Sequence, residues 1–285
     1  MAKHGNRAST SKSGSADVLA SIKTPKQPRL ETVIPTTLSQ VYEKTNYAFL
    51  FAQNFHLGMR HVAAVRKEMP NPTIFNLLGP LANPADTLIE ARVIGVKKTD
   101  LVPVFAEALR LSGVKKAMVV CGAEHLDEIS CAGKTHCARL VQRSSLLNSD
   151  NDDLEVGADV SIEEFEISPE DFGLPAHSLS TVSPGLTPDE NADILARLLK
   201  NEIPADDPIL DFVLMNTASL FVISGVCEGK TSAFGHTGKV IEETGPGNGR
   251  WKEGVRLARL AITSGRAWDM LRGFAEVTNE LSSKQ

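Results

Sequence analysis

A polar stretch close to the amino terminus, Lys3 to Asp17 (KHGNRASTSKSGSAD), has the residue types that bind a polyanion. It carries three cationic side chains, a histidine, an amide, five hydroxyls and two glycines, without the apolar periodicity of a core element. Fixed positive charge, hydroxyl donors and glycines where the backbone must come close are what a phosphate-binding loop requires. Ser13 or Ser15 is in place to cap a helix beginning at Ala16, whose first N–H groups would then face an anion.

Composition by itself leaves a second interpretation of this stretch open. Residues 1–29 hold six Lys or Arg against one acid, a balance that also suits a solvated terminus or a transit peptide. Gly5, Gly14, Pro25 and Pro28 interrupt the amphipathic helix that a transit peptide needs. The residue types therefore leave the anion-binding loop and the solvated terminus about equally matched.

A carboxylate pair, Asp127–Glu128, is the second group that could do chemistry, and it follows the apolar run 117–121. In an open α/β sheet, ligands bind in the loops beyond the carboxyl ends of the strands. Adjacent carboxylates there suit Mg²⁺, which takes few protein oxygens and keeps positions for water and substrate phosphates. From the residue types alone, an acidic pair on the surface is the simpler interpretation.

The third candidate is Arg66, which lies on a predicted helix beside Phe51, Phe55, His56 and Met59. A planar guanidinium next to an aromatic surface suits an aromatic carboxylate, because it can bind both carboxylate oxygens at once. The plainer interpretation is a surface arginine whose neighbours belong to a helical core.

Around these groups the sequence predicts an α/β fold with a mostly parallel central sheet flanked by helices. Strand patterns occur at 89–96, 117–121, 137–141 and 162–167, with a helix over 100–112 between the first two. Further helices are expected as short consecutive segments within 37–69, at 73–78, from Thr187-Pro188 onward, and over 208–226, 250–263 and 266–281. Ten acids and no base over 144–171 predict a solvated surface segment.

Composition narrows the class of protein. The 285 residues carry a net charge of −5, so the basic amino-terminal stretch is a local feature and the chain is not a nucleic-acid binder. The apolar run 209–226 comes nearest to a membrane span, but Asp211 and Asn216 interrupt it, so no membrane partner is expected. The four cysteines show no C-x-x-C spacing and predict reduced thiols in a cytoplasmic protein.

Three segments together resemble one enzyme family, the anthranilate phosphoribosyltransferases, and its fungal branch in particular. The Lys3–Asp17 stretch resembles the family's loop for phosphoribosyl pyrophosphate (PRPP), and residues 126–130 (LDEIS) match its magnesium motif. Residues 73–84 (TIFNLLGPLANP) form a long segment that is specific to the family. The resemblance runs from residue 3 to the carboxyl terminus.

The resemblance implies a glycosyltransferase of tryptophan biosynthesis that moves the 5-phosphoribosyl group from PRPP to anthranilate and releases pyrophosphate. It implies Mg²⁺ as cofactor on Asp127 and Glu128, and the anthranilate-carboxylate arginine at Arg66. The family's His-Pro-x-Met and VAPVR segments are changed here, because Leu57 and Ala64 replace prolines. The implied substrate-binding residues of the amino-terminal loop are Lys3, His4, Asn6, Arg7, Ser9, Ser11 and Ser13.

The family's fold resembles that of pyrimidine nucleoside phosphorylases. The implied domains are an α/β phosphoribosyltransferase domain (1–36 and 81–285) and the remaining segment of a small helical domain (37–80), through which a homodimer would form. Family members carry a helical bundle and a Gly-rich phosphate loop upstream of the KHGN stretch, and these lack a counterpart in this sequence. We therefore expect uncovered apolar surface on 37–80. A nucleoside phosphorylase-like enzyme and a truncated, inactive remnant remain the alternatives.

Overall fold

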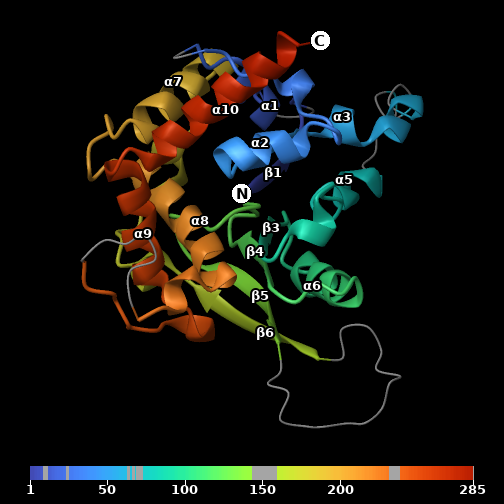
Figure 1. Ribbon diagram of the computed structural model, residues 1–285. Helices are drawn as coiled ribbons and strands as arrows, with labels where there is room; N and C mark the ends of the chain where they lie inside the picture. The colour runs from blue at the N-terminus through green and yellow to red at the C-terminus, as the bar shows by residue number, and fades with distance from the viewer. Residues whose placement is uncertain are drawn as a thin grey trace. The chain divides into compact units, whose positions relative to one another are not determined.

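The computed structural model describes residues 1–8, 12–23, 26–62, 65, 68, 73–142, 159–230 and 238–284 (Figure 1). The chain divides into two compact units. The first consists of Met1–Leu88, Pro184–Pro204 and Ala261–Gln285, and the second of Ile89–Ser183 and Ala205–Leu260. The domain boundaries expected at 37 and 80 stay a prediction.

The first unit is built around a two-stranded parallel sheet. Strand β1 pairs with β2 in a register that sets Lys3 opposite Phe49 and His4 opposite Leu50. All of β2 is buried, and helix α10 packs against both α2 and α7. The elements of this unit are β1 (Ala2–Gly5), α1 (Ser15–Ala20), α2 (Leu38–Thr45), β2 (Ala48–Phe51), α3 (Ala52–Phe55), α5 (Phe75–Leu78), α7 (Pro188–Leu199) and α10 (Arg266–Ser282).

Strand β2 corrects the sequence prediction, which placed only short helices within 37–69. Residues 48–51 (AFLF) are apolar without a break, and periodicity cannot tell a short buried strand from a buried helical turn. The pairing with β1 decides the conformation, and it joins residues 46 positions apart. On either side of β2, that region does contain short helices, α2 and α3, as predicted.

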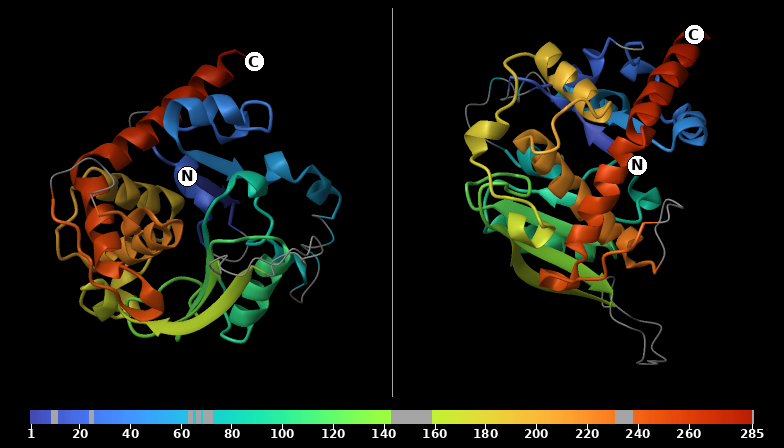
Figure 2. Two further views of the ribbon diagram at one scale, coloured as in Figure 1. Left: turned by 60° about the horizontal axis from the view of Figure 1, so that its bottom comes forward. Right: turned by 90° about the vertical axis from the view of Figure 1, so that its left-hand side faces the viewer.

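The second unit contains a four-stranded sheet in the order β3-β4-β5-β6. Helix α6 packs against β4, β5 and β6, and α8 packs against β3. Figure 2 shows β6 as a long, curved strand. The elements are β3 (Arg92–Gly95), α6 (Leu101–Leu111), β4 (Ala117–Gly122), β5 (Thr135–Gln142), β6 (Val160–Ile167), α8 (Pro208–Ser224) and α9 (Trp251–Thr263), whose last residues fall in the first unit.

The α/β class is confirmed, but the mostly parallel sheet is wrong for the strands that the structure describes. Strands β3 and β4 are parallel, whereas β4 with β5 and β5 with β6 are antiparallel. A parallel connection needs a crossover, usually a helix, to bring the chain back to the same end of the sheet. Residues 123–134 between β4 and β5 form turns and bends instead, so the chain reverses directly.

Capping residues account for the ends of two predicted helices, α7 and α8. Helix α7 begins with the predicted capping box, because the Thr187 hydroxyl accepts the N–H of Glu190 at 3.2 Å and the Glu190 carboxylate accepts the N–H of Thr187 at 3.3 Å. Helix α8 begins at Pro208 with Asp207 as its N-cap, and it ends at Gly225, whose φ of 86° is left-handed.

The core of the second unit includes thiols as well as hydrocarbon side chains. Leu214 and Met215 of α8 are fully buried. Burial raises the pKa of the Cys227 thiol to about 12, with the nearby Glu253 adding to the shift, and burial also raises the pKa of the Cys137 thiol. The free, buried cysteines are Cys121, Cys131, Cys137 and Cys227.

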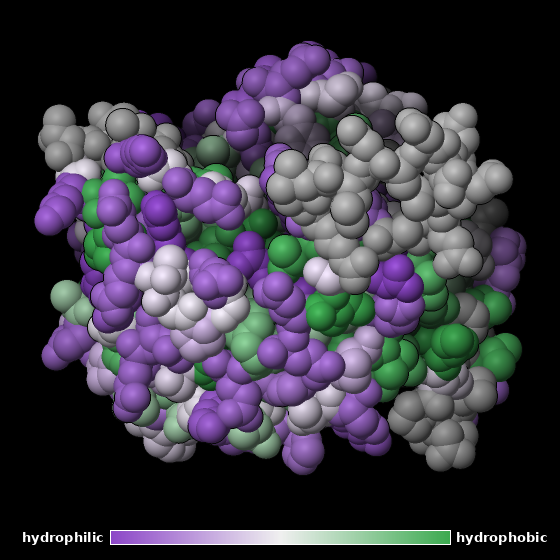
Figure 3. All heavy atoms as spheres, turned by 90° about the horizontal axis from the view of Figure 1, so that it is seen from below, coloured by the Kyte–Doolittle hydropathy of each residue, from purple (hydrophilic) through white to green (hydrophobic). Residues whose placement is uncertain are grey.

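The surface carries both hydrophilic and hydrophobic side chains (Figure 3). Figure 3 shows a face on which hydrophobic side chains gather within a largely hydrophilic surface. Val104 and Leu111 of α6 are among the exposed apolar side chains of the second unit, each 58% exposed. Of the helices in the described ranges, none has both the length and the hydropathy needed to cross a membrane.

Leu214→Ala should lower the free energy of unfolding by about 2–5 kcal/mol, because it leaves a cavity at a fully buried position. The matched Leu111→Ala variant removes the same atoms from a side chain that is 58% exposed, and should change stability by less than about 0.5 kcal/mol. Urea denaturation followed by circular dichroism measures both. Equal effects of the two variants would contradict the packing described for α8.

Candidate functional site

The amino-terminal loop is closed by one carboxylate. Asp17 Oδ2 accepts the backbone N–H groups of Ala8 at 2.8 Å and Gly14 at 3.1 Å. A second closure joins the N–H of Ala16 to the carbonyl of Asn6 at 3.2 Å. Gly14 fits because a Cβ there would lie 2.3 Å from the nitrogen of Ala8. The two ends of the loop are therefore held together by Asp17.

This geometry corrects the expected helix cap. Helix α1 starts at Ser15, and Gly14 occupies the N-cap position that was predicted for Ser13 or Ser15. The Asp17 side chain, at the third helical position, accepts the N–H of Gly14, which is the half of a capping box that an acidic residue supplies. Ser13 is turned to a different partner: Asn191 Nδ2 of α7 lies 3.2 Å from its hydroxyl.

The described members of the predicted substrate loop have different surroundings. Lys3, Asn6 and Arg7 are exposed. Arg7 lies 3.6 Å from the Asp17 carboxylate and 5.9 Å from the centre of the Phe51 ring. Ser9, Ser11 and Arg66 lie outside the described residues, so their predicted roles rest on the sequence.

His4 contacts His56, a residue that was not predicted to belong to the site. Its Nε2 lies 3.1 Å from Nε2 of His56, and the two rings meet edge to face with centroids 5.0 Å apart. Burial and then the neighbouring His56 lower the pKa of His4 to about 4, although the backbone of Gly79 opposes that shift. His4 is therefore neutral at neutral pH. The signal for His56 was its place in the altered His-Pro-x-Met segment.

The Asp127–Glu128 pair lies in the second unit, on the loop that follows β4. Both residues are exposed, while Ile129 directly after them is fully buried. The loop begins with a bridge between Gly122 and Leu126, and His125 in its turn has a left-handed φ of 60°. Two adjacent carboxylates on a held turn are an oxygen donor set that suits a divalent cation.

The backbone of β3 lies directly against this loop. A Cβ on Gly95 would be 1.6 Å from the carbonyl oxygen of Asp127, so only glycine fits at this position without movement of the backbone. The loop is also hydrogen bonded through Ile129 to Asn216 of α8. Neither Gly95 nor Asn216 lies in a sequence motif that would have marked it as part of the site.

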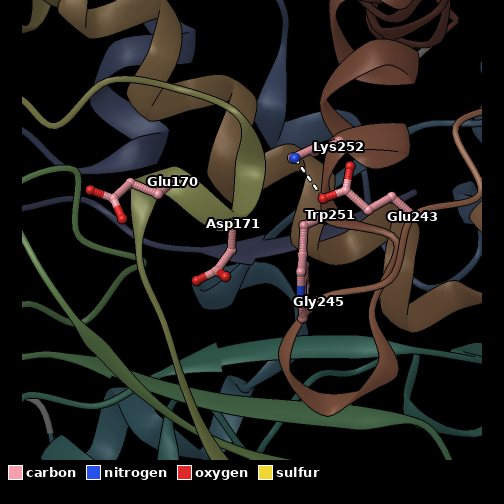
Figure 4. A pocket seen from close by; sticks show the side chains of 6 residues that line it. All are labelled: Glu170, Asp171, Glu243, Gly245, Trp251 and Lys252. Carbon is pink, nitrogen blue, oxygen red and sulfur yellow. Dashed lines mark hydrogen bonds and ion pairs between the residues drawn. The ribbon is translucent and has the colours of Figure 1, made fainter.

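A small cavity of about 130 Å³ elsewhere in the second unit involves none of the predicted site residues. Trp251, whose ring centre is 5.4 Å from that of Phe172, forms one wall. Figure 4 shows Lys252 directed at Glu243, with their charged atoms 2.6 Å apart. The lining residues are Glu170, Asp171, Glu243, Gly245, Trp251 and Lys252. We therefore interpret this cavity as a gap in the packing around Trp251 and assign no function to it.

Residues 1–268 match the family described as "Glycosyl transferase family, a/b domain", so the fold and site define a glycosyltransferase class. The fission yeast (Schizosaccharomyces pombe) anthranilate phosphoribosyltransferase is 39% identical over 280 residues, which are 98% of this chain and 66% of that protein. The Petrotoga mobilis enzyme of the same name is 37% identical over 99% of this chain and 68% of its own length. The chain belongs to the anthranilate phosphoribosyltransferase family.

Solved structures agree. The Saccharomyces cerevisiae anthranilate phosphoribosyltransferase in complex with PRPP and Mg matches this chain with a TM-score of 0.75 and 31% sequence identity. The match covers 98% of this chain and 65% of the yeast chain. The Thermus thermophilus enzyme gives a TM-score of 0.73 at 33% identity, over 98% of this chain and 68% of its own. The chain spans about two thirds of the length of these relatives.

Gly95→Ala should lower the free energy of unfolding by about 1–3 kcal/mol, because the new methyl group forces β3 away from the Asp127 carbonyl. Gly58→Ala is the matched control, since Gly58 lies in the 3-10 turn Leu57–His61, has no left-handed φ and has nothing within 4 Å of an added Cβ. That control should be neutral or more stable by a few tenths of a kcal/mol. Urea denaturation compares them, and a stable Gly95→Ala variant would contradict the close approach.

The pKa of His4 predicts a loss of stability in acid. It is about 4 in the folded chain and about 6.5 in the unfolded chain, so between these values the unfolded state binds a proton that the folded state does not. Stability from His4 is therefore present above pH 6.5 and is lost as the pH falls toward 4. His4→Gln should flatten this part of a melting-temperature profile, whereas His125→Asn at an exposed histidine should keep the wild-type slope. Parallel profiles for all three proteins would refute the shift.

Proposed function

We propose that this chain transfers the 5-phosphoribosyl group from PRPP to the amine of anthranilate and releases pyrophosphate. The observation that carries the proposal is the 31% identical Saccharomyces cerevisiae enzyme in complex with PRPP and Mg, whose fold this chain shares over 98% of its length. The closed polar loop and the exposed carboxylate pair support it further, because they supply donors for a diphosphate and oxygens for a cation.

In this proposal the amino-terminal loop binds PRPP. Lys3 and Arg7 are exposed cations that can reach a diphosphate without first being desolvated, and the hydroxyls of Ser9, Ser11 and Ser13 add donors. As the bond between C1 and the pyrophosphate oxygen breaks, negative charge grows on the leaving group. Cations and hydroxyls that are already in position stabilise that charge without reorganising. Asp17 keeps the loop closed, and Arg7 balances its charge.

Asp127 and Glu128 would hold Mg²⁺, which when bound neutralises pyrophosphate charge. The fit of the carboxylates to the ion rests on their exposure, on their adjacency and on the held backbone beneath them. Mg²⁺ commonly takes only one or two protein carboxylates and fills its other positions with water and phosphate oxygens. An exposed pair of carboxylates leaves those other positions open to the solvent and to a diphosphate.

Anthranilate would be oriented by His4, Asn6 and Arg66. The amine of anthranilate is already a nucleophile, so the site must align it with C1 rather than activate it. As the bond between nitrogen and C1 forms and the bond between C1 and the pyrophosphate oxygen breaks, the nitrogen becomes positive, and it then loses a proton to solvent water. A neutral His4, lowered in pKa by burial, avoids repelling that developing charge.

A homodimer through segment 37–80 is also part of the proposal. Leu57 and Ile74 in this segment are 61% and 63% exposed, and Leu77 and Leu78 are 42% and 40% exposed. Exposed apolar side chains that gather in one patch mark interaction sites on soluble proteins. The exposed leucines agree with the expectation that this segment carries uncovered apolar surface.

The test is a fluorescence assay of anthranilate consumption by the purified chain with PRPP and MgCl₂. Asp127→Asn and Glu128→Gln should each lower turnover on the order of 100-fold, because each removes charge from the metal site. EDTA should abolish turnover and excess Mg²⁺ restore it. Glu163→Gln is the control, since Glu163 is an exposed carboxylate on β6.

Two outcomes would overturn the proposal. Phosphorolysis of thymidine by the wild-type chain, without consumption of anthranilate, would assign it to the nucleoside phosphorylase alternative. No turnover of either substrate by a folded wild-type chain would favour the inactive remnant.

A further inference from the structure

Asn216 occupies an unusual position for its side chain. It lies in the middle of α8, a 17-residue helix in which Leu214 and Met215 next to it are fully buried. Asparagine is a weak helix former, because its amide competes with the backbone for hydrogen bonds. A half-buried amide at this place must find partners for one acceptor and two donors, or it destabilises the helix.

The partners of Asn216 lie on the loop that carries the carboxylate pair. Its Oδ1 accepts the backbone N–H of Ile129 at 2.9 Å, and its Nδ2 donates to the carbonyl of the same residue at 3.2 Å. Nδ2 also donates to the carbonyl of Phe212, one turn earlier in α8, at 3.0 Å. The amide therefore holds both polar groups of one loop residue, in the way that a neighbouring strand would hold them.

The two hydrogen bonds between Asn216 and Ile129 form a clamp. Ile129 follows Glu128 directly, so its N–H, which the clamp holds, belongs to the peptide that ends the carboxylate pair. Within the pair, the backbone of Gly95 lies directly against the carbonyl of Asp127, which belongs to the peptide joining the two acids. Beyond Ile129, the N–H of Ser130 donates to the hydroxyl of Thr135 at 2.9 Å, and Thr135 is fully buried. The loop backbone is hydrogen bonded directly after the pair and lies close against Gly95 at the pair, while the two carboxylates project from it exposed.

We propose that Asn216 is a positioning residue for a divalent cation, which it serves by fixing the backbone from which Asp127 and Glu128 project. The inference rests on the metal role of that pair in the proposed function. Two neighbouring carboxylates bind a cation tightly only when their directions are set before the ion arrives. When a residue that hydrogen bonds to metal ligands and orients them is removed, metal affinity typically falls by roughly 10- to 100-fold.

Asn279 of α10 provides a matched control. Its Nδ2 donates to the carbonyl of Ala275, one turn earlier in its helix, at 2.8 Å, and to the carbonyl of Gln27 in a distant segment at 2.9 Å. It therefore makes the same kind of helix-to-loop contact as Asn216, in the unit that lacks the carboxylate pair. Asn279→Leu loses such a contact without touching the loop of Asp127.

The experiment is a titration of the full chain with Mn²⁺, with free Mn²⁺ measured by electron paramagnetic resonance. The wild-type chain, Asn216→Leu, Asn279→Leu and the double variant Asp127→Asn/Glu128→Gln are compared. Amide hydrogen exchange at Ile129 reports separately on the clamp. If Asn216→Leu does not fold, Asn216→Ser takes its place, because a serine hydroxyl is too short to hold both groups of Ile129.

We expect the Kd for Mn²⁺ to rise roughly 10- to 100-fold in the Asn216 variant and to change less than about twofold in Asn279→Leu, with faster exchange at Ile129 only in the former. A folded Asn216 variant that binds Mn²⁺ like the wild type overturns this inference and leaves the metal site standing. Mn²⁺ binding by the wild type that the double carboxylate variant retains, or no binding at all, overturns the metal site and this inference with it.

Discussion

A loop that carries functional groups must still find partners for its own backbone N–H and C=O groups, and in this chain side chains of helices supply them. Asp17 of α1 accepts two N–H groups that close the amino-terminal loop. Asn216 of α8 accepts one N–H group and donates to one carbonyl in the loop of the carboxylate pair. In both cases the anchor belongs to a packed helix, so the loop backbone takes its position from the core, while Arg7 on the first loop and Asp127 and Glu128 on the second are exposed.

The charged groups of the proposed function are divided between the two units by sign. The cations Lys3 and Arg7 are exposed in the first unit, and the carboxylates of Asp127 and Glu128 are exposed in the second. Because all four stay hydrated in the free chain, none carries the cost of an unpaired buried charge. Asp17 is the exception, a carboxylate inside a cationic loop. Two backbone N–H groups and the nearby guanidinium of Arg7 compensate its charge.

Features that depend on neighbours in the sequence could be predicted. The capping box at Thr187, the start of α8 at Pro208 and the strand 117–121 each rest on a local pattern, and the structure confirms them within a few residues. Motif likeness identified the loop and the carboxylate pair in the same way. The family was therefore recognisable before the fold was known.

Features that depend on partners far along the chain could not be predicted. The pairing of β1 with β2, the reversal between β4 and β5 and the contact of His4 with His56 all need the three-dimensional arrangement. In the sequence, Asn216 is only a polar residue that interrupts an apolar run. Its hydrogen bonds join positions 87 residues apart, which no local pattern encodes.

The interior thiols give the chain a property of practical value. Cys121, Cys131, Cys137 and Cys227 are all free and buried, and burial keeps the best shielded of them protonated. Since the thiolate is the reactive form, alkylating reagents and mild oxidants have little to attack in the native state. The rate at which such a reagent modifies the thiols then reports how often the native state unfolds enough to expose them, without any added label.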